Sequence, residues 1–240
     1  MAGAGAGAAV EDPAAFRFRV QQDFHEIPLG LGVDEEVFDE RMADFARDYW
    51  GEAEELEPLR KAMKAMYTAN ARQLATEGAV YHALGVFPIG GTADGAEAPE
   101  RVSRCSLVMS VRDLEVPDPG LAAAGIAEWL GRSSAGGEAH LITLPAGPAV
   151  VHVSGSRAVW EREGGEEERF FARIEVWIPF PDQDRVLLLC LSTSDVQDLF
   201  MYQAVLADVA DTVVFGSSEP AGEAGEPAVH TPGPRSHTFG

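Results

Sequence analysis

The sequence predicts an α+β fold in which a mostly antiparallel sheet of about six strands carries packed helices. Apolar residues recur at helical spacing in some segments and alternate with polar residues in others. Short stretches rich in Gly, Pro and acidic residues separate the strand-like runs, as hairpin connections do. No internal repeat is visible, so one sheet covered by helices accounts for the pattern.

The N-terminal part predicts two short extended segments followed by two helices. The extended segments are Phe16–Val20 and Phe24–Leu29. Asp34 is a candidate N-cap for the first helix, and Pro58 fits the first turn of the second. One face of each helix carries residues at spacings of three and four and is predicted to pack inward. These faces comprise Phe38, Met42, Phe45 and Tyr49 in the first helix, and Leu59, Met63, Met66, Asn70 and Leu74 in the second.

After Gly78 the hydrophobic period changes from that of a helix to that of a strand. Val80–Phe87 and Cys105–Val111 predict two strands, and the loop between them indicates antiparallel pairing. Asp118 and Pro119 then predict the N-cap and first turn of a short helix. Four further strand candidates follow this helix: His140–Leu144, Ala149–Val153, Phe170–Ile178 and Val186–Leu191.

The last strand and the helix after it form the best-marked element of the chain. Leu187–Leu191 is apolar on both faces, which predicts a central strand covered on both sides. Ser194 with Gln197 three residues later predicts a capping box at the start of the final helix. Apolar residues at helical spacing continue to Val213, and the helix is expected to end before Gly216.

The composition of the two ends differs from that of the middle. Residues 1–15 are rich in Ala and Gly, and residues 216–240 are rich in Gly, Pro, Ser and Glu. Such segments bury too little apolar surface to offset the entropy of ordering, so both are predicted to be disordered. Residues 16–215 are therefore expected to form a single α+β domain.

The chain is strongly acidic. It has 39 Asp and Glu residues against 18 Lys and Arg, a formal net charge of −21. Long-range repulsion then opposes nucleic acid and anionic membrane surfaces as partners. The charge favours another protein with a basic surface as the partner, or serves solubility alone.

The start of the chain has no positively charged region followed by a leucine-rich run, and no run approaches 18 apolar residues. These features predict no membrane insertion and a cytoplasmic location. Cys105 and Cys190 both lie inside apolar strand-like runs, which favours two buried free thiols. A disulfide or a reactive thiol is the alternative for this pair.

Several short motifs resemble an uncharacterised family of actinobacterial proteins. They are Glu77-Gly78-Ala79 at a helix end, the strand Cys105–Val111, and the runs LPAGPAV (144–150), VWIPFP (176–181) and LLLCLSTS (187–194). The resemblance covers most of residues 24–215 and rests on turns, strands and caps. It implies a PsbP-like α/β/α sandwich, a scaffold that mostly serves as a binding or accessory module. Some members of such families lie near type VII secretion or toxin genes, and for those members the resemblance implies a link to such a system.

No segment has the pattern of an activated nucleophile. Ser154-Gly155-Ser156 is followed by Arg157 instead of a helix, and Ser192-Thr193-Ser194 lacks the glycines of a nucleophile elbow. The second triplet is better explained as helix capping. Anion binding by its hydroxyls at the helix N-terminus is the alternative, and Asp195 and Asp198 in the first turn argue against it.

The six histidines show no ligand spacing typical of zinc. Strand pairing can still bring His140 and His152 together, although a site needs further ligands. His230 and His237 belong to the predicted tail. His25 and His82 are the other two histidines.

The acidic runs are predicted to be solvated surface, where a carboxylate performs no acid–base chemistry. They are Asp34 to Glu36, Asp39 and Glu40, Glu52 to Glu57, and Glu166 to Glu168. Gly90-Gly91 and Gly164-Gly165 lack the lysine and helix of a phosphate loop. The sequence thus assigns no catalytic, cofactor or metal residue.

Three hypotheses for function follow from these patterns. The first is a non-enzymatic accessory or protein-interaction module that uses its acidic surface on a basic partner. The second is a structural or assembly component of a larger complex. The third is an enzyme or metal-binding protein whose pocket is built from strand histidines and carboxylates.

Overall fold

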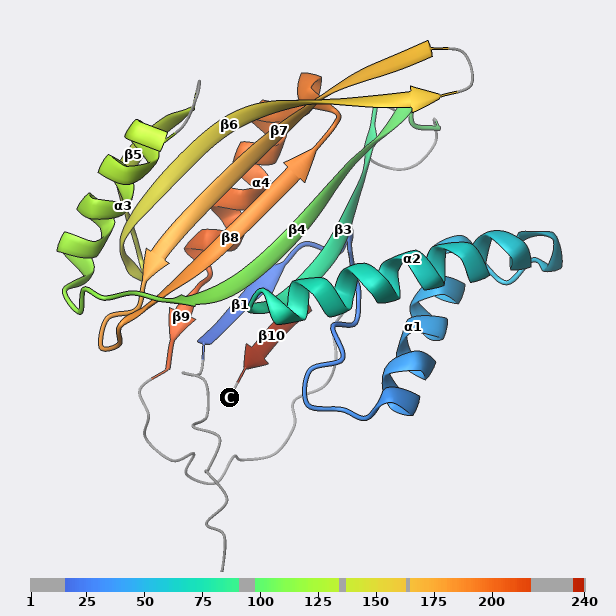
Figure 1. Ribbon diagram of the computed structural model, residues 1–240, viewed down its shortest axis with the longest axis horizontal. Coiled ribbons are helices and arrows are strands. Elements are labelled where there is room, and N and C mark those ends of the chain that lie inside the picture. The colour runs from blue at the N-terminus through green and yellow to red at the C-terminus, as the bar shows by residue number, and fades with distance from the viewer. Residues whose placement is uncertain (1–15, 91–97, 134–136, 163–164, 217–234, 240) are drawn as a thin grey trace, which may run out of the picture.

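The computed structural model describes residues 16–90, 98–133, 137–162, 165–216 and 235–239. The predicted α+β class is confirmed (Figure 1). A seven-stranded sheet has the order β2-β3-β4-β8-β7-β6-β5, and a three-stranded sheet has the order β10-β1-β9. Every pairing in both sheets is antiparallel.

The large sheet contains β2 (Phe24–Glu26), β3 (Ala79–Ile89), β4 (Arg101–Asp113), β5 (Glu138–Leu144), β6 (Gly147–Arg162), β7 (Gly165–Pro179) and β8 (Arg185–Thr193). The small sheet contains β1 (Phe16–Val20), β9 (Val214–Phe215) and β10 (Arg235–Phe239). The helices are α1 (Glu35–Trp50), α2 (Glu57–Thr76), α3 (Pro119–Ser133) and α4 (Leu199–Asp211), with 3-10 turns at Glu54–Leu56 and Val196–Asp198. Among the described residues, no helix is long and apolar enough to cross a membrane.

One face of the large sheet, here called the back face, builds the main core. Leu187, Leu189 and Leu191 of β8 are fully buried on it. Helix α4 and strand β1 contribute apolar side chains to the same cluster, and Figure 1 shows α4 lying behind the sheet. Successive side chains of a strand point to opposite faces, so every second residue of β8 faces this core.

Among the described residues, helices cover the opposite, front face only at its two ends. Helices α1 and α2 pack near β3 and β4, where Leu84 and Val108 join their cluster. Helix α3 packs over the other end, where Val150, Val186 and Trp177 join a separate cluster. Figure 1 shows α3 and the α1–α2 pair on either side of the central strands. The expectation that β8 is central is therefore correct. It was also expected to be covered on both sides, but in the part of the chain that the structure describes no helix covers the middle of the front face.

The helix starts test the predicted caps. Asp34 Oδ1 accepts from the Val37 N–H at 2.9 Å, and Asp118 Oδ1 accepts from the Leu121 N–H at 2.7 Å, so both N-caps are confirmed. The capping box of Ser194 is wrong. A 3-10 turn precedes α4, no side chain caps it, and the carboxylate of Asp195 accepts instead from the Arg104 N–H of β4 at 2.7 Å.

The two ends of the chain lie mostly outside the described residues. The predicted disorder of residues 1–15 falls there, as does that of residues 217–234 and 240. Arg235–Phe239 differ from the expected tail, because they form β10 in register with β1, pairing Phe239 with Phe16 and Arg235 with Val20. Strand β1 otherwise has an unpaired edge, and β10 supplies its hydrogen-bond partners.

Gly78 lies in the turn that connects α2 to β3, and substitution of this residue tests the geometry of that turn. Its φ is +83°, and a Cβ placed on it would lie 2.8 Å from the Val111 carbonyl oxygen. Gly32 has a φ of +67°, but a Cβ placed there would meet only open space. We expect Gly32→Ala to lower the free energy of unfolding by about 1–2 kcal/mol, the cost of a left-handed backbone for a residue with a Cβ.

We expect Gly78→Ala to cost roughly 1–3 kcal/mol more than Gly32→Ala, because a backbone clash adds to the same conformational strain. Urea unfolding of the two variants and the wild type measures both values. Equal losses in the two variants would show that the close approach of Gly78 to β4 is not as described.

Candidate functional site

A groove lies on the uncovered middle of the front face, between the C-terminal end of α2 and helix α3. Its volume is about 520 Å³, which is within the range of small-molecule pockets. Side chains from β4, β6, β7 and β8 form its floor, and Leu74 of α2 and Trp129 of α3 are among the residues at its sides. We call it the front groove.

Strand register arranges the floor of the front groove in three cross-strand rows. The first row is apolar over β6 to β8, the second contains the titratable groups, and the third is polar throughout. In strand order β6, β7, β8 and β4, the rows are Val150, Trp177, Leu188 and Ser110; His152, Glu175, Cys190 and Val108; and Ser154, Arg173, Ser192 and Ser106. Val150 and Ser106 complete the rows but do not line the groove.

A buried charge-assisted pair occupies the second row. His152 Nδ1 lies 2.8 Å from Glu175 Oε2, and the two residues are only 4% and 7% exposed. A carboxylate in its ionised form accepts hydrogen bonds only, and the N–H of the imidazole is then the donor in this contact. This contact fixes the orientation of the imidazole ring, as the partner of a ligating or catalytic histidine does.

Cys190 lies next to Glu175 in the same row and is a free thiol. Burial raises the pKa of its thiol above the ordinary value, and the nearby guanidinium of Arg173 acts in the opposite direction. The thiol therefore stays protonated at neutral pH and is a poor nucleophile. Cys105 is also free and faces the core, where burial raises its pKa to about 12. The predicted free thiols are confirmed, although Cys190 is half-buried.

The indole ring of Trp177, which lines the groove, has a hydrogen-bond donor without a described acceptor. Its indole Nε1 is buried and has no acceptor among the residues that the structure describes. The ring packs against Trp129 of α3 in an edge-to-face arrangement, with centroids 6.1 Å apart. A buried donor without a partner is unfavourable, so this position favours an acceptor that is supplied from outside the protein.

Arg173 places a positive charge at the polar end of the floor. Its Nη1 lies 3.6 Å from Glu175 Oε1, which is longer than a hydrogen bond, and its side chain is 58% exposed. Ser154 and Ser192 are its register neighbours on either side. Arg112 of β4 also lines the groove, but it lies beyond the apolar row, in register with Val186. A guanidinium between two hydroxyls is a suitable receptor for an anion.

The histidine pair considered from the sequence does not form. His140 is in register with Val151, so it shares a face with Val151 and lies on the face opposite His152. It is exposed and lies 3.4 Å from Glu138 Oε2. Within the described ranges, no three His, Cys, Asp or Glu side chains converge to hold a metal ion. His230 lies outside the described residues, and His237 lies in β10.

The serine triplets contribute single residues to the front groove. Ser154 and Ser192 line it, whereas Ser156 and Ser194 are exposed. Glu175, Arg173 and Trp177 were missed, although they stand at alternate positions of one predicted strand. Polar residues on a strand's inward-facing positions are the signal that would have found them. The acidic residues Asp34 to Glu36, Asp39 and Glu40 are exposed on or next to α1, as predicted.

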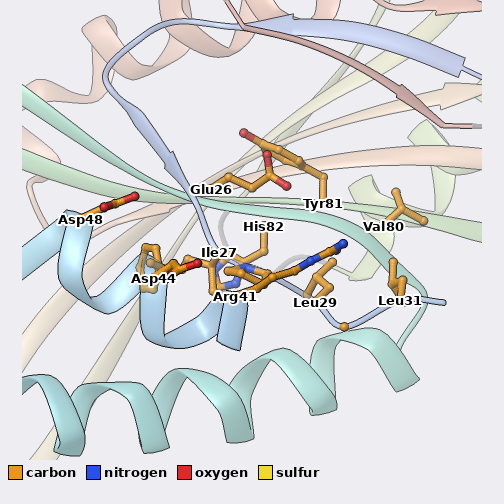
Figure 2. Close-up of a pocket in the computed structure, with 13 residues that line it drawn as sticks. Glu26, Ile27, Leu29, Leu31, Arg41, Asp44, Asp48, Val80, Tyr81 and His82 are labelled. Carbon is orange, nitrogen blue, oxygen red and sulfur yellow. The ribbon is translucent and has the colours of Figure 1, made fainter. Parts of the chain in front are cut away.

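A second cavity of about 380 Å³ lies between α1, β3 and the chain that connects β2 to α1. Figure 2 shows His82 pointing from β3 toward α1, on the side opposite Tyr81, with Arg41, Asp44 and Asp48 on α1. His82 is 4% exposed, and its Nε2 lies 3.2 Å from Oγ of Ser106, the last residue of the polar row. The Nδ1 of His82 has no hydrogen-bond partner within the described chain.

Comparison with known proteins gives one distant structural neighbour. No protein-family model and no curated protein matches the chain. A solved structure of LpqN, described as involved in cell envelope biogenesis of Mycobacterium tuberculosis, is 13% identical, with a TM-score of 0.38. The match covers 87% of this chain and 88% of that chain. The PsbP-like sandwich expected from the sequence is not shown by this match.

The cytoplasmic location expected from the sequence is corrected at this point. The structural neighbour is described as a protein of cell envelope biogenesis, which is at odds with a cytoplasmic assignment. The expectation rested on a missing signal pattern and a missing apolar span, and these features do not by themselves define a compartment.

The buried imidazole of His82 predicts an acid-sensitive fold. Burial lowers the pKa of His82 from 6.5 to about 4. Between these values the unfolded chain binds a proton that the folded chain does not bind, so stability falls as the pH falls. The contribution is complete above pH 6.5 and is lost toward pH 4, on the order of 3 kcal/mol in total.

Replacing His82 by Gln removes the titrating group and keeps a donor for Ser106. We expect His82→Gln to flatten the decline of unfolding free energy between neutral pH and about pH 4.5, measured by urea unfolding at each pH. His140→Gln is the matched control, because it removes an exposed imidazole and is expected to keep the slope of the wild type. A His82→Gln variant with an unchanged slope would refute the assignment.

Proposed function

We propose that this protein is a non-enzymatic binding module that holds a small molecule in the front groove. The observation that carries the proposal is the buried polar floor, on which His152 and Glu175 lie beside a Trp177 donor with no described acceptor. Burying such groups costs free energy that apolar residues at the same positions would not cost. A bound ligand that uses these groups offsets that cost.

The chemistry of the floor favours binding over catalysis. The protonated thiol of Cys190 is not an activated nucleophile, because burial raises its pKa. The PsbP-like resemblance of the sequence, a scaffold associated with binding and accessory roles, is compatible with the same proposal but rests on fold alone.

A second candidate is the predicted interaction with a basic protein, such as a component of a secretion or toxin system. The observation that favours it is a group of exposed carboxylates where α1 turns into α2. This end of the helical pair projects beyond the sheet in Figure 1. The group comprises Glu52, Glu54 and Glu55.

Blocking the front groove tests the first proposal. Ser154→Trp places a large ring in the groove, and Ser156→Trp places the same ring on the same face of β6 at an exposed position. Each protein is incubated with a cell extract of small molecules and examined by native mass spectrometry. We expect a bound mass on the wild type and on Ser156→Trp, with at least about tenfold lower occupancy on Ser154→Trp, because a filled pocket excludes its ligand.

Equal occupancy in the two tryptophan variants would place the ligand elsewhere and contradict the proposal. A wild-type protein that carries no bound mass from any extract would contradict it as well. Circular dichroism of both variants shows whether Ser154→Trp keeps the native fold. Should it unfold, Ser192→Met, which fills less of the same groove, takes its place.

Charge removal tests the second candidate. Replacing Glu52, Glu54 and Glu55 together by Gln is expected to weaken a salt-sensitive interaction with a basic partner in a pull-down, because exposed charges act through screened attraction. The control removes three exposed charges elsewhere, with Gln at Glu115 and Glu138 and Asn at Asp182. Retention of the same protein at low and high salt by both triple variants would exclude this acidic group as the contact.

A further inference from the structure

The floor of the front groove changes from apolar to polar along the direction of the strands. Trp177 and Leu188 lie in its apolar row, and Arg173 and Ser192 lie in its polar row. Trp177 and Arg173 are four residues apart on β7, so their Cα atoms are separated by roughly 13 Å at about 3.3 Å per residue. One end of a ligand therefore meets aromatic and aliphatic side chains, and the other meets a cation and hydroxyl groups.

The apolar end is formed jointly by the sheet and α3. Trp129 of α3 packs on the edge of Trp177 and is 57% exposed at the rim. Leu130 is buried next to it in the chain, and Leu188 lies on the floor. A large apolar ring left half in solvent gains from contact with an apolar ligand, since its exposed surface is then removed from water.

The polar end selects for negative charge. Arg173 keeps guanidinium N–H donors available, because its contact with Glu175 is 3.6 Å long and a guanidinium has five donors. Oε2 of Glu175 is already occupied by His152. Arg112 also lines the groove, but it is in register with Val186 beyond the apolar row, so Arg173 is the guanidinium at this end of the floor.

The net charge of the whole chain also limits which anions the groove can bind. With a net charge of −21, the protein repels anions at long range. A small hydrophilic anion would have to overcome this repulsion through contacts with Arg173 and the serine hydroxyls alone. An apolar portion that packs on Trp129 and Trp177 supplies binding free energy that the repulsion does not oppose.

We infer that the ligand of the front groove is an acidic amphiphile, with a carboxylate or phosphate at Arg173 and an apolar chain or ring system along Trp177 and Trp129. This inference rests on the proposed binding function and names the class of its ligand. An oxygen acceptor in the apolar portion would satisfy the buried indole N–H of Trp177. The acid can belong to a fatty acid or to a phosphate monoester, since a guanidinium binds both.

Calorimetric titration with single-chain probes of equal length tests this inference. Dodecanoate and dodecyl phosphate represent the two sources of acid, dodecanol lacks the charge, and dodecyltrimethylammonium reverses it. All probes are used below the concentrations at which they form micelles. We expect at least one acid to bind at least about tenfold more tightly than dodecanol, the effect of one charge-assisted contact. Acetate, which has no apolar portion, is expected to show no binding.

Replacement of Arg173 tests whether its guanidinium causes the preference for acids over dodecanol. We expect Arg173→Gln to remove most of the tenfold difference between the acids and dodecanol. Arg169→Gln is the matched control, because Arg169 is exposed on the same strand and faces the same side without lining the groove. Arg169→Gln is expected to bind the acids as the wild type does.

The outcomes separate this inference from the proposed function. Binding of dodecanol or dodecyltrimethylammonium as tight as that of the acids, but lost in Ser154→Trp, would overturn the acid class and leave groove binding in place. Binding of the acids that survives Ser154→Trp would overturn both. Failure of every acid probe to bind the wild type would overturn this inference, while the native mass spectrometry of cell extracts still decides the proposed function.

Discussion

Burial of the back face of the large sheet is the constraint on which the rest of the structure depends. The leucines of β8 pack with α4 and with the apolar side chains of the neighbouring strands in one cluster. A strand that shifts by one residue exchanges its two faces, so this cluster fixes the register of β4, β7 and β8. The same register then decides which residues stand side by side on the front face. The front groove is thus a consequence of the packing behind it.

The front face of the sheet is covered by helices at some positions and lines the groove at others. Apolar positions near β3 and near β6 receive helices, which complete two smaller clusters. Strands β6 and β7 also carry His152, Glu175 and Arg173, which line the groove instead. A buried polar pair such as His152 and Glu175 stabilises a sheet less than well-packed apolar residues would, because desolvation of the two groups offsets their attraction. Their place in a cavity of about 520 Å³ makes ligand binding the simplest explanation of that cost.

Much of the fold was predictable from local patterns, and the front groove was not. Apolar spacing and the caps at Asp34 and Asp118 locate α1 and α3, because these signals lie within one element. The strand order places β4 beside β8, which is far away in sequence. The residue pattern within either strand does not indicate which strand it pairs with. His152 was singled out, but its partner is Glu175 on the next strand, whereas His140 faces the other side. The capping box of Ser194 failed because Asp195 and Asp198 bond across to β4.

The indole N–H of Trp177 offers the most direct measurement of the central claim, that the front groove is a ligand-binding site. In a ¹⁵N-labelled protein the four tryptophans give four indole signals, and Trp177→Phe identifies the one that belongs to Trp177. We predict that this signal moves on addition of an acidic amphiphile, while the signal of Trp50, which packs in the α1–α2 cluster, stays in place. A Trp177 signal that does not respond to any ligand bound by the protein would contradict the claim.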